Sequence, residues 1–238
     1  MLEALIFDVD GTVAETEDLH RRAFNLAFAR HGLDMAWNEP DYRRLLRTSG
    51  GKERIARAIA ERGAKLPGED IAAIHATKTA LYDELVRGEG VRWRPGIQAL
   101  MAEGRARGLG LALATTTSDA NLEPLFRPAM GERWRASFAA IVTGDQVPRK
   151  KPAPDVYIET LRRLRVAAAD AIAFEDSRAG VEAARAAGVP VVATPSYWLA
   201  GDDLSQADLV VDHLGDAEAL IAWHAQRHAE GQERRAHA

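Results

Sequence analysis

The chain has 238 residues, a formal net charge of −4, and apolar and charged fractions of 47% and 28%. This length allows one core with a modest second domain, and the composition is that of an ordinary globular protein rather than a disordered chain or a fibre. The small negative charge excludes a field that would attract nucleic acid or an anionic membrane, and the lack of cysteine excludes disulfides, thiolate chemistry and cysteine-ligated zinc.

The sequence contains no apolar run that approaches the roughly 18 residues of a membrane span. It also opens without a basic segment followed by an apolar stretch, which a secretory signal would require. We therefore expect a cytoplasmic protein that binds neither membranes nor nucleic acid.

The first predicted element is a buried strand at residues 4–7, followed directly by Asp8-Val9-Asp10-Gly11-Thr12. Two carboxylates this close repel each other, and both stay ionised only if a cation or a shared proton compensates. The pair therefore indicates a metal site or an acid/base pair. An ordinary turn is the alternative interpretation, because Asp and Gly are common turn residues.

Residues 15–92 contain several helical patterns and no convincing strand. Residues 17–31 place apolar side chains on one face, and further helices are marked by Ile55, Ile59, Ile71 and Ile74. Arg94-Pro95-Gly96 signals the return to the core, with the proline in the first turn of the next helix. We expect a helical cap domain of residues 15–92 above a core of residues 1–14 and 93–223.

Five more strands are predicted at residues 109–114, 139–142, 171–174, 189–193 and 209–211. Helical patterns at residues 97–107, 154–164 and 178–187 lie between them. This alternation predicts an α/β fold with a doubly wound, mostly parallel sheet covered on both faces. Residues 127–135 are longer than a minimal helix-to-strand connection, and the polar tail of residues 224–238 is expected to be a frayed helix end or disordered.

Three polar segments follow these later strands: Thr115-Thr116-Thr117, Lys150-Lys151-Pro152 and Glu175-Asp176-Ser177. Hydroxyls at a strand end can donate to phosphate, a lysine held by prolines is a fixed point charge, and two acids ending an apolar strand need a partner or a metal. The alternatives are helix capping by the hydroxyls or by Asp176, and solvation for one of the lysines. The order of acid pair, hydroxyl, lysine and acid pair, each at a strand end, favours one shared site.

With these motifs the chain resembles the haloacid-dehalogenase superfamily over about residues 1–215. The resemblance points to its CbbY-like and β-phosphoglucomutase branch through residues 14–24, Gly50-Gly51-Lys52-Glu53-Arg54-Ile55, residues 114–117 and residues 151–155. It implies a Rossmann-like core with a mobile cap. It also implies a Mg²⁺-dependent phosphatase that works through an aspartyl phosphate.

The resemblance implies four catalytic residues: Asp8, Asp10, Thr115 and Lys151. Asp8 would attack phosphorus, and Asp10 would protonate the leaving oxygen and then activate water. The magnesium ligands that it implies are Asp8, Asp176 and the backbone carbonyl of Asp10, with Glu175 in the outer shell.

CbbY-like enzymes remove the C1 phosphate of xylulose 1,5-bisphosphate, a by-product of carbon fixation, and we take this sugar phosphate as the expected substrate. A bisphosphate needs a second cationic pocket. The expected substrate-binding residues are Glu17, His20, Tyr42, Gly50, Gly51, Lys52, Arg54, His75, Lys78, Thr116, Thr117 and Asn121. Solvation of the cap cations, or a packing role for His20 and Tyr42, is the alternative.

Other functions use similar residues. A β-phosphoglucomutase shares the aspartate pair and the cap, and phosphoglycolate is another possible phosphatase substrate. Outside enzymes, a phospho-accepting receiver domain combines an acid cluster, Thr and Lys, and a sugar-phosphate sensor could use the same scaffold. The helical insertion after the first motif argues against a receiver, and retention of Asp10 argues against a sensor. We expect a monomer, although the sequence leaves the oligomeric state open.

Overall fold

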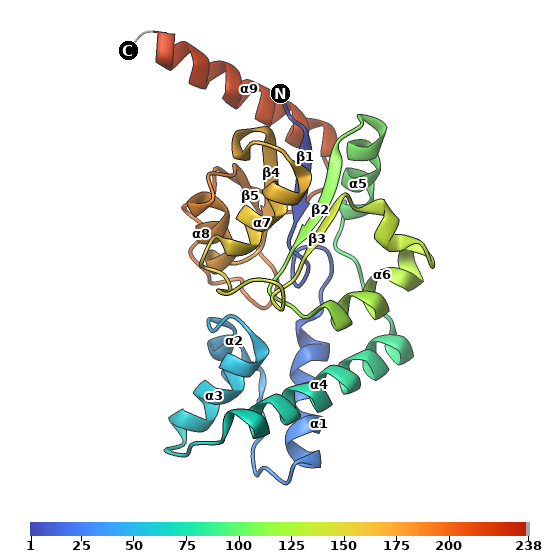
Figure 1. The fold of residues 1–238 in the computed structure, drawn as a ribbon, viewed down its shortest axis with the longest axis vertical. Helices are drawn as coiled ribbons and strands as arrows, with labels where there is room; N and C mark the ends of the chain where they lie inside the picture. Colours follow the sequence, from blue (N-terminus) through green and yellow to red (C-terminus); the bar gives the residue numbers. More distant parts are fainter. Residues whose placement is uncertain (237–238) are drawn as a thin grey trace.

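The computed structural model describes residues 1–236, with the side chains of residue 228 and of residues 230–236 outside that description. Its centre is a parallel sheet of six strands in the order β3-β2-β1-β4-β5-β6 (Figure 1). The strands are β1 (Ala4–Phe7), β2 (Gly110–Ala114), β3 (Ala140–Val142), β4 (Ala171–Glu175), β5 (Val191–Ala193) and β6 (Leu209–Val210). All six predicted strands and the α/β fold class are confirmed.

Alternate side chains of β1 enter two separate hydrophobic clusters. Leu5 and Phe7 belong to the cluster on one face of the sheet, and Ala4 and Ile6 to the cluster on the other. The first cluster includes side chains of α5 (Ile97–Ala106), α6 (Leu122–Met130) and α9 (Ala217–Ala236), and the second includes α7 (Asp155–Leu164) and α8 (Arg178–Ala186). Burial on both faces explains why the strands read as short apolar runs.

The insertion after β1 forms α1 (Glu17–Arg30), α2 (Glu39–Leu46), α3 (Gly51–Glu61) and α4 (Gly68–Glu89). These helices share a third hydrophobic cluster and lie beyond the carboxyl ends of the strands (Figure 1). At their base, Ala14 pairs with Trp93 and the Glu15 amide donates to the Arg92 carbonyl. The two chain segments that link the core to the cap therefore lie side by side at this point. We propose the expected division here, into a core of residues 1–14 and 93–223 and a cap of residues 15–92.

Two connections in the core differ from simple expectations. Pro95 is not in the first turn of a helix, because α5 begins at Ile97 after the N-cap Gly96, whose φ is 86°. Residues 127–135 comprise the end of α6, a short link and the start of a 3₁₀ turn (Trp134–Ser137) that buries Trp134. The Trp134 ring stacks on that of Phe126, with centroids 5.0 Å apart. The extra length of this connection therefore places an aromatic side chain in the core.

The polar tail begins inside α9 rather than after it. His224 is buried and its Nε2 lies 2.8 Å from the Ala169 carbonyl, while Trp223 packs against the core cluster. This first part of the tail is therefore docked helix. Among residues 1–236, a search for helices with the length and hydropathy of a membrane span finds none.

Candidate active site

Four polar segments meet at the carboxyl edge of the sheet. Asp8 follows β1, Thr115 follows β2, and Glu175 with Asp176 closes β4, while Lys151 arrives from the loop between β3 and α7. Because β1 lies between β2 and β4, residues that are distant in sequence become neighbours here. The sheet order thus brings the four motifs together.

Lys151 links the first and last motifs. Its Nζ donates to Asp8 Oδ1 at 2.6 Å, to Glu175 Oε1 at 2.6 Å and to the Ala114 carbonyl at 2.8 Å. Burial alone would lower the pKa of Lys151, but the two carboxylates outweigh it and raise the pKa above its ordinary value. Lys151 is therefore a fixed buried cation, as expected of one member of the lysine pair.

Three carboxylates gather around this point. Oxygen atoms of Asp8, Glu175 and Asp176 lie within 4.8 Å of one another, and all three side chains are buried. Burial, together with neighbouring acids, raises the pKa of Asp8 to about 8 and raises that of Asp176. Within the described residues, Glu175 Oε2 and Asp176 Oδ2 have no hydrogen-bond partner. Buried, unpartnered carboxylate oxygens fit a hard divalent cation.

The loop around Asp176 leaves that carboxylate free for such a role. The Ser177 hydroxyl caps α8 by accepting from the Gly180 amide at 3.1 Å, so Asp176 is not needed as the cap. Gly11, with a φ of 81°, packs so closely that a Cβ there would lie 2.0 Å from Asp176 Oδ2. The first motif therefore needs glycine where it passes the acid cluster.

Asp10 is held apart from the three clustered carboxylates. It accepts from Thr16 Oγ1 at 2.5 Å and from His20 Nε2 at 3.0 Å, and His20 Nδ1 lies 2.6 Å from Lys78 Nζ. Burial alone would raise the pKa of Asp10, but His20 and Thr16 lower it to about 2. Burial and Lys78 in turn lower the pKa of His20. The Asp10 side chain is thus oriented by the cap, and it is absent from the group of potential metal ligands.

A cavity of about 470 Å³ lies between the core and the cap. It is lined by most of the expected site residues, namely Asp8, Asp10, Glu17, His20, Gly50, Gly51, Lys52, Arg54, His75, Lys78, Thr115, Thr116, Thr117, Asn121, Lys151 and Asp176. On the cap side, Arg54 is a buried basic residue, burial lowers the pKa of Lys78 to about 7, and Glu17 adds a buried carboxylate. The cavity therefore places basic side chains of the cap opposite the acid cluster of the core.

Two of the expected residues stand behind the cavity rather than on it. Glu175 is fully buried and bonds to Lys151 and to the Tyr157 hydroxyl. Tyr42 is also fully buried, and its hydroxyl donates to Glu17 Oε2 at 2.6 Å while accepting from Arg54 Nη1 at 3.0 Å. Tyr42 therefore acts on the cavity through Glu17 and Arg54.

Lys150 is a cavity residue that the sequence analysis did not assign. Its Nζ lies 2.9 Å from Glu53 Oε2. This ion pair joins the core loop that carries Lys150 to the first turn of α3, next to Gly50. The duplicated lysine was the available signal, but two adjacent identical residues do not reveal which one is buried. Lys150 is thus an ion-paired residue at the rim and not a fully solvated one.

The comparisons with known proteins agree with this geometry. The profile of the haloacid dehalogenase-like hydrolases matches residues 2–188. The CbbY protein of Cupriavidus necator is 50% identical over 229 residues, covering 94% of this chain and 90% of the relative. CbbY from Rhodobacter sphaeroides, solved with phosphate and, as a mutant, with xylulose 1,5-bisphosphate, is 44% identical, with a TM-score of 0.87 and coverage of 91% and 96% of the two chains.

A β-phosphoglucomutase from Clostridium difficile is similar in fold, with 22% identity, a TM-score of 0.79 and coverage of 96% of this chain and 100% of that one. The profile match and the two CbbY relatives show that the chain belongs to the haloacid dehalogenase-like hydrolase family, in its CbbY-like branch. The chain is accordingly an enzyme of the phosphatase class. The resemblance found in the sequence is confirmed.

Proposed function

We propose that this enzyme is a magnesium-dependent sugar phosphatase that converts xylulose 1,5-bisphosphate to xylulose 5-phosphate and phosphate. The observation that carries the proposal is Lys151, which bonds Asp8 and Glu175 at the floor of a cavity whose cap wall carries basic side chains. A nucleophilic carboxylate next to a fixed cation suits the attack of one anion on another, and magnesium bound beside Asp8 would lower its raised pKa and keep it ionised. The complex of a related CbbY mutant with this bisphosphate supports the choice of substrate.

In the first step, a carboxylate oxygen of Asp8 forms a bond to phosphorus while the bond to the sugar C1 oxygen breaks. Asp10 gives its proton to that leaving oxygen. The low pKa of Asp10 describes the free site, and the incoming phosphates add negative charge that raises it and favours the protonated form. Lys151 and the Thr115 hydroxyl hold the transferring group.

In the second step, Asp10 takes a proton from a water molecule, whose oxygen attacks the phosphoryl group on Asp8. The acyl phosphate bond breaks, which releases phosphate and restores the Asp8 carboxylate. Asp8 and Asp176 would hold magnesium, with the Asp10 carbonyl as a further ligand and Glu175 in the outer shell. When bound, this ion would offset the repulsion between Asp8 and the substrate phosphate.

The cap side of the cavity is proposed to bind the rest of the substrate. Lys52, Arg54 and Lys78, together with the Gly50-Gly51 turn at the start of α3, would bind the distal phosphate. The sugar hydroxyls would contact Glu17, His20, His75, Asn121, Thr116 and Thr117. All of these residues come from one chain, so we propose that a monomer is sufficient for the reaction.

The test is a phosphate-release assay on xylulose 1,5-bisphosphate, with and without magnesium, beside phosphoglycolate and β-glucose 1-phosphate. We expect phosphate from the bisphosphate to dominate and chelation of the metal to abolish it. Asp10→Asn should slow release by about 10²–10⁴-fold, because it removes the acid and the base together. Rapid isomerisation of β-glucose 1-phosphate without phosphate release would instead identify a mutase.

A further inference from the structure

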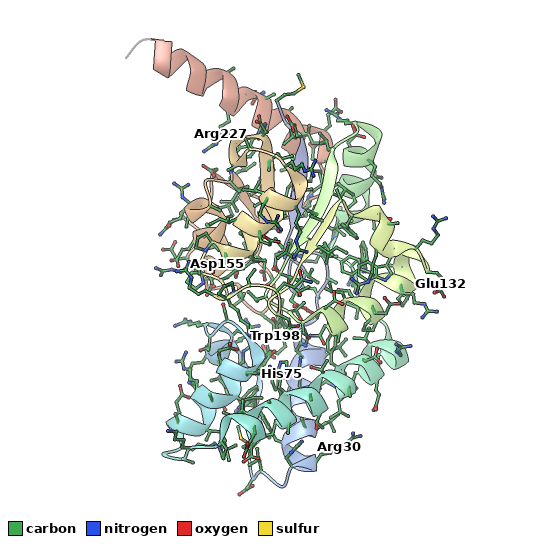
Figure 2. All side chains as sticks on the ribbon, in the orientation of Figure 1. Arg30, His75, Glu132, Asp155, Trp198 and Arg227 are labelled. Carbon is green, nitrogen blue, oxygen red and sulfur yellow. The ribbon has the colours of Figure 1, made fainter. Side chains whose placement is uncertain are left out.

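Trp198 belongs to the core by its position in the chain but to the cap by its packing. It lies between β5 and β6, yet its buried side chain is part of the hydrophobic cluster formed by the cap helices. Figure 2 shows it where the core meets the cap. Besides the two covalent connections, the core therefore reaches the cap through this side chain.

Arg43 of α2 holds this segment in place. Its Nη1 donates to the carbonyls of Tyr197 at 2.7 Å and Trp198 at 3.2 Å, and its guanidinium lies 4.4 Å and 5.3 Å from their ring centroids. The Tyr197 hydroxyl also donates to Glu39 of the same helix at 3.0 Å. These contacts fix the main chain on both sides of the Trp198 ring against α2.

The Trp198 ring meets Tyr42 edge to face, with centroids 5.6 Å apart and an interplanar angle of 85°. On its other sides Tyr42 packs against the cap aromatics Phe24 and Trp37. Tyr42 is the residue whose hydroxyl bonds both Glu17 and Arg54, and burial raises its pKa, which keeps it a donor. The orientation of two cavity residues thus depends on a ring supplied by the core.

We propose that Trp198 is a positioning residue for substrate recognition, acting through Tyr42 on Glu17 and Arg54. The inference rests on the proposed function in one respect, since it takes the cap wall of the cavity to bind the sugar phosphate beyond the reacting group. A substrate that extends to Glu17 and Arg54 depends on Trp198. A small ester that occupies only the Asp8 end does not.

The experiment compares Trp198→Leu, Trp198→Phe and the matched control Trp134→Leu, which removes another buried tryptophan ring that belongs to a core cluster and not to the cap cluster. KM and kcat are measured for xylulose 1,5-bisphosphate and for p-nitrophenyl phosphate. An edge-to-face pair supports a rise in KM for the bisphosphate on the order of tenfold in Trp198→Leu. We expect little change in kcat, since ground-state and transition-state binding are lost equally.

Hydrolysis of p-nitrophenyl phosphate should stay near wild type in Trp198→Leu, and Trp198→Phe should restore most of the bisphosphate KM. Trp134→Leu should lower thermal stability without changing the ratio of the two KM values. Hydrogen exchange supplies a second readout, with faster exchange in α2 (Glu39–Leu46) for Trp198→Leu and unchanged exchange in β1. Parallel changes in both KM values, or unchanged exchange in α2, would overturn the inference.

Two further arms keep the outcome decisive. If Trp198→Leu does not fold, the partly exposed Arg43 is replaced by methionine, which releases the Trp198 main chain and should also raise the bisphosphate KM. An unchanged KM in Arg43→Met would then count against the inference. Wild-type enzyme that cleaves p-nitrophenyl phosphate but not the bisphosphate would instead refute the proposed substrate, and exchange in α2 would still decide the role of Trp198.

Discussion

Replacing Lys151 with methionine keeps most of the side-chain volume and removes the charge shared by two carboxylates. Lys151 is 4% exposed and lies 2.6 Å from both Asp8 Oδ1 and Glu175 Oε1. Breaking such a buried pair costs about 3–5 kcal/mol. For a chain of this length, that corresponds to a fall in melting temperature of roughly 6–20 °C. Protonation of Asp8, whose pKa is already about 8, should keep the loss in the lower part of that range.

Activity and metal affinity should move in opposite directions in Lys151→Met. Loss of a preorganised donor to the transferring phosphoryl group lowers kcat by about 10²–10³-fold. At the same time the acid cluster of Asp8, Glu175 and Asp176 loses its neighbouring cation, so its net charge becomes more negative at a pH where Asp8 is ionised. Magnesium should therefore bind the variant more tightly than the wild type. General misfolding would weaken both properties together.

The assay pairs thermal denaturation, with and without magnesium, with phosphate release at saturating metal. Lys150→Met is the control, because it removes the same charge from the preceding residue, whose ion pair with Glu53 is partly exposed. We expect a larger magnesium-induced rise in melting temperature for Lys151→Met than for the wild type or the control. Near-normal turnover, or a smaller rise in a folded variant, would refute the electrostatic account of this site.

Three further predictions concern the rim, the cap and α8. Lys150→Met should raise KM for the bisphosphate and Glu53→Gln should lower it, with stability changes below about 1 kcal/mol; equal effects of the two variants in steady-state kinetics would contradict this. Burial, with nearby lysines, lowers the pKa of His75 from 6.5 to about 3. Below pH 6.5 the unfolded chain therefore binds a proton that the folded chain does not. The free energy of unfolding should decrease by about 1 kcal/mol for each unit by which the pH is lowered, down to about pH 3. His75→Asn should abolish that component in urea titrations from pH 6.5 to 4.5, and parallel pH curves would exclude it. Ser177→Ala should cost about 1 kcal/mol in the same titrations, because it removes the α8 cap, whereas Ser118→Ala, which removes no capping bond, should cost little.

The catalytic floor could be predicted from the sequence because it is built from strand ends. A short apolar run fixes where a strand stops, and parallel pairing places those ends on one edge. Asp8 after residues 4–7 and Glu175 after residues 171–174 are thereby expected at one edge, and the pairing of β1 with β4 in the structure makes them neighbours. The different position of the Asp10 side chain could not be predicted, since its partners Thr16 and His20 come from the start of the cap.

The cap wall was less accessible to sequence reasoning. Helical periodicity shows which face of α2 is apolar, but it does not show that the Tyr42 hydroxyl meets Glu17 rather than a substrate. Trp198 carried no signal at all, because an aromatic residue in a polar connection looks like any exposed loop residue. Its burial depends on how the segment after β5 folds against α2, a contact between residues more than 150 positions apart.

This difference in construction separates the two tasks of the enzyme. The reacting groups are fixed by the sheet, so changes to Asp8, Lys151 or Thr115 should lower kcat for every phosphate ester. The selecting groups are fixed by side-chain relays within the cap, so changes to Glu17 or Arg54 should act on KM for particular sugars. Trp198 belongs to the core by its place in the chain, as the reacting groups do, but its side chain packs with the cap residues that hold the selecting groups. Substitutions in the connection after β5 should therefore alter substrate selection, although that connection follows directly from a strand of the catalytic sheet.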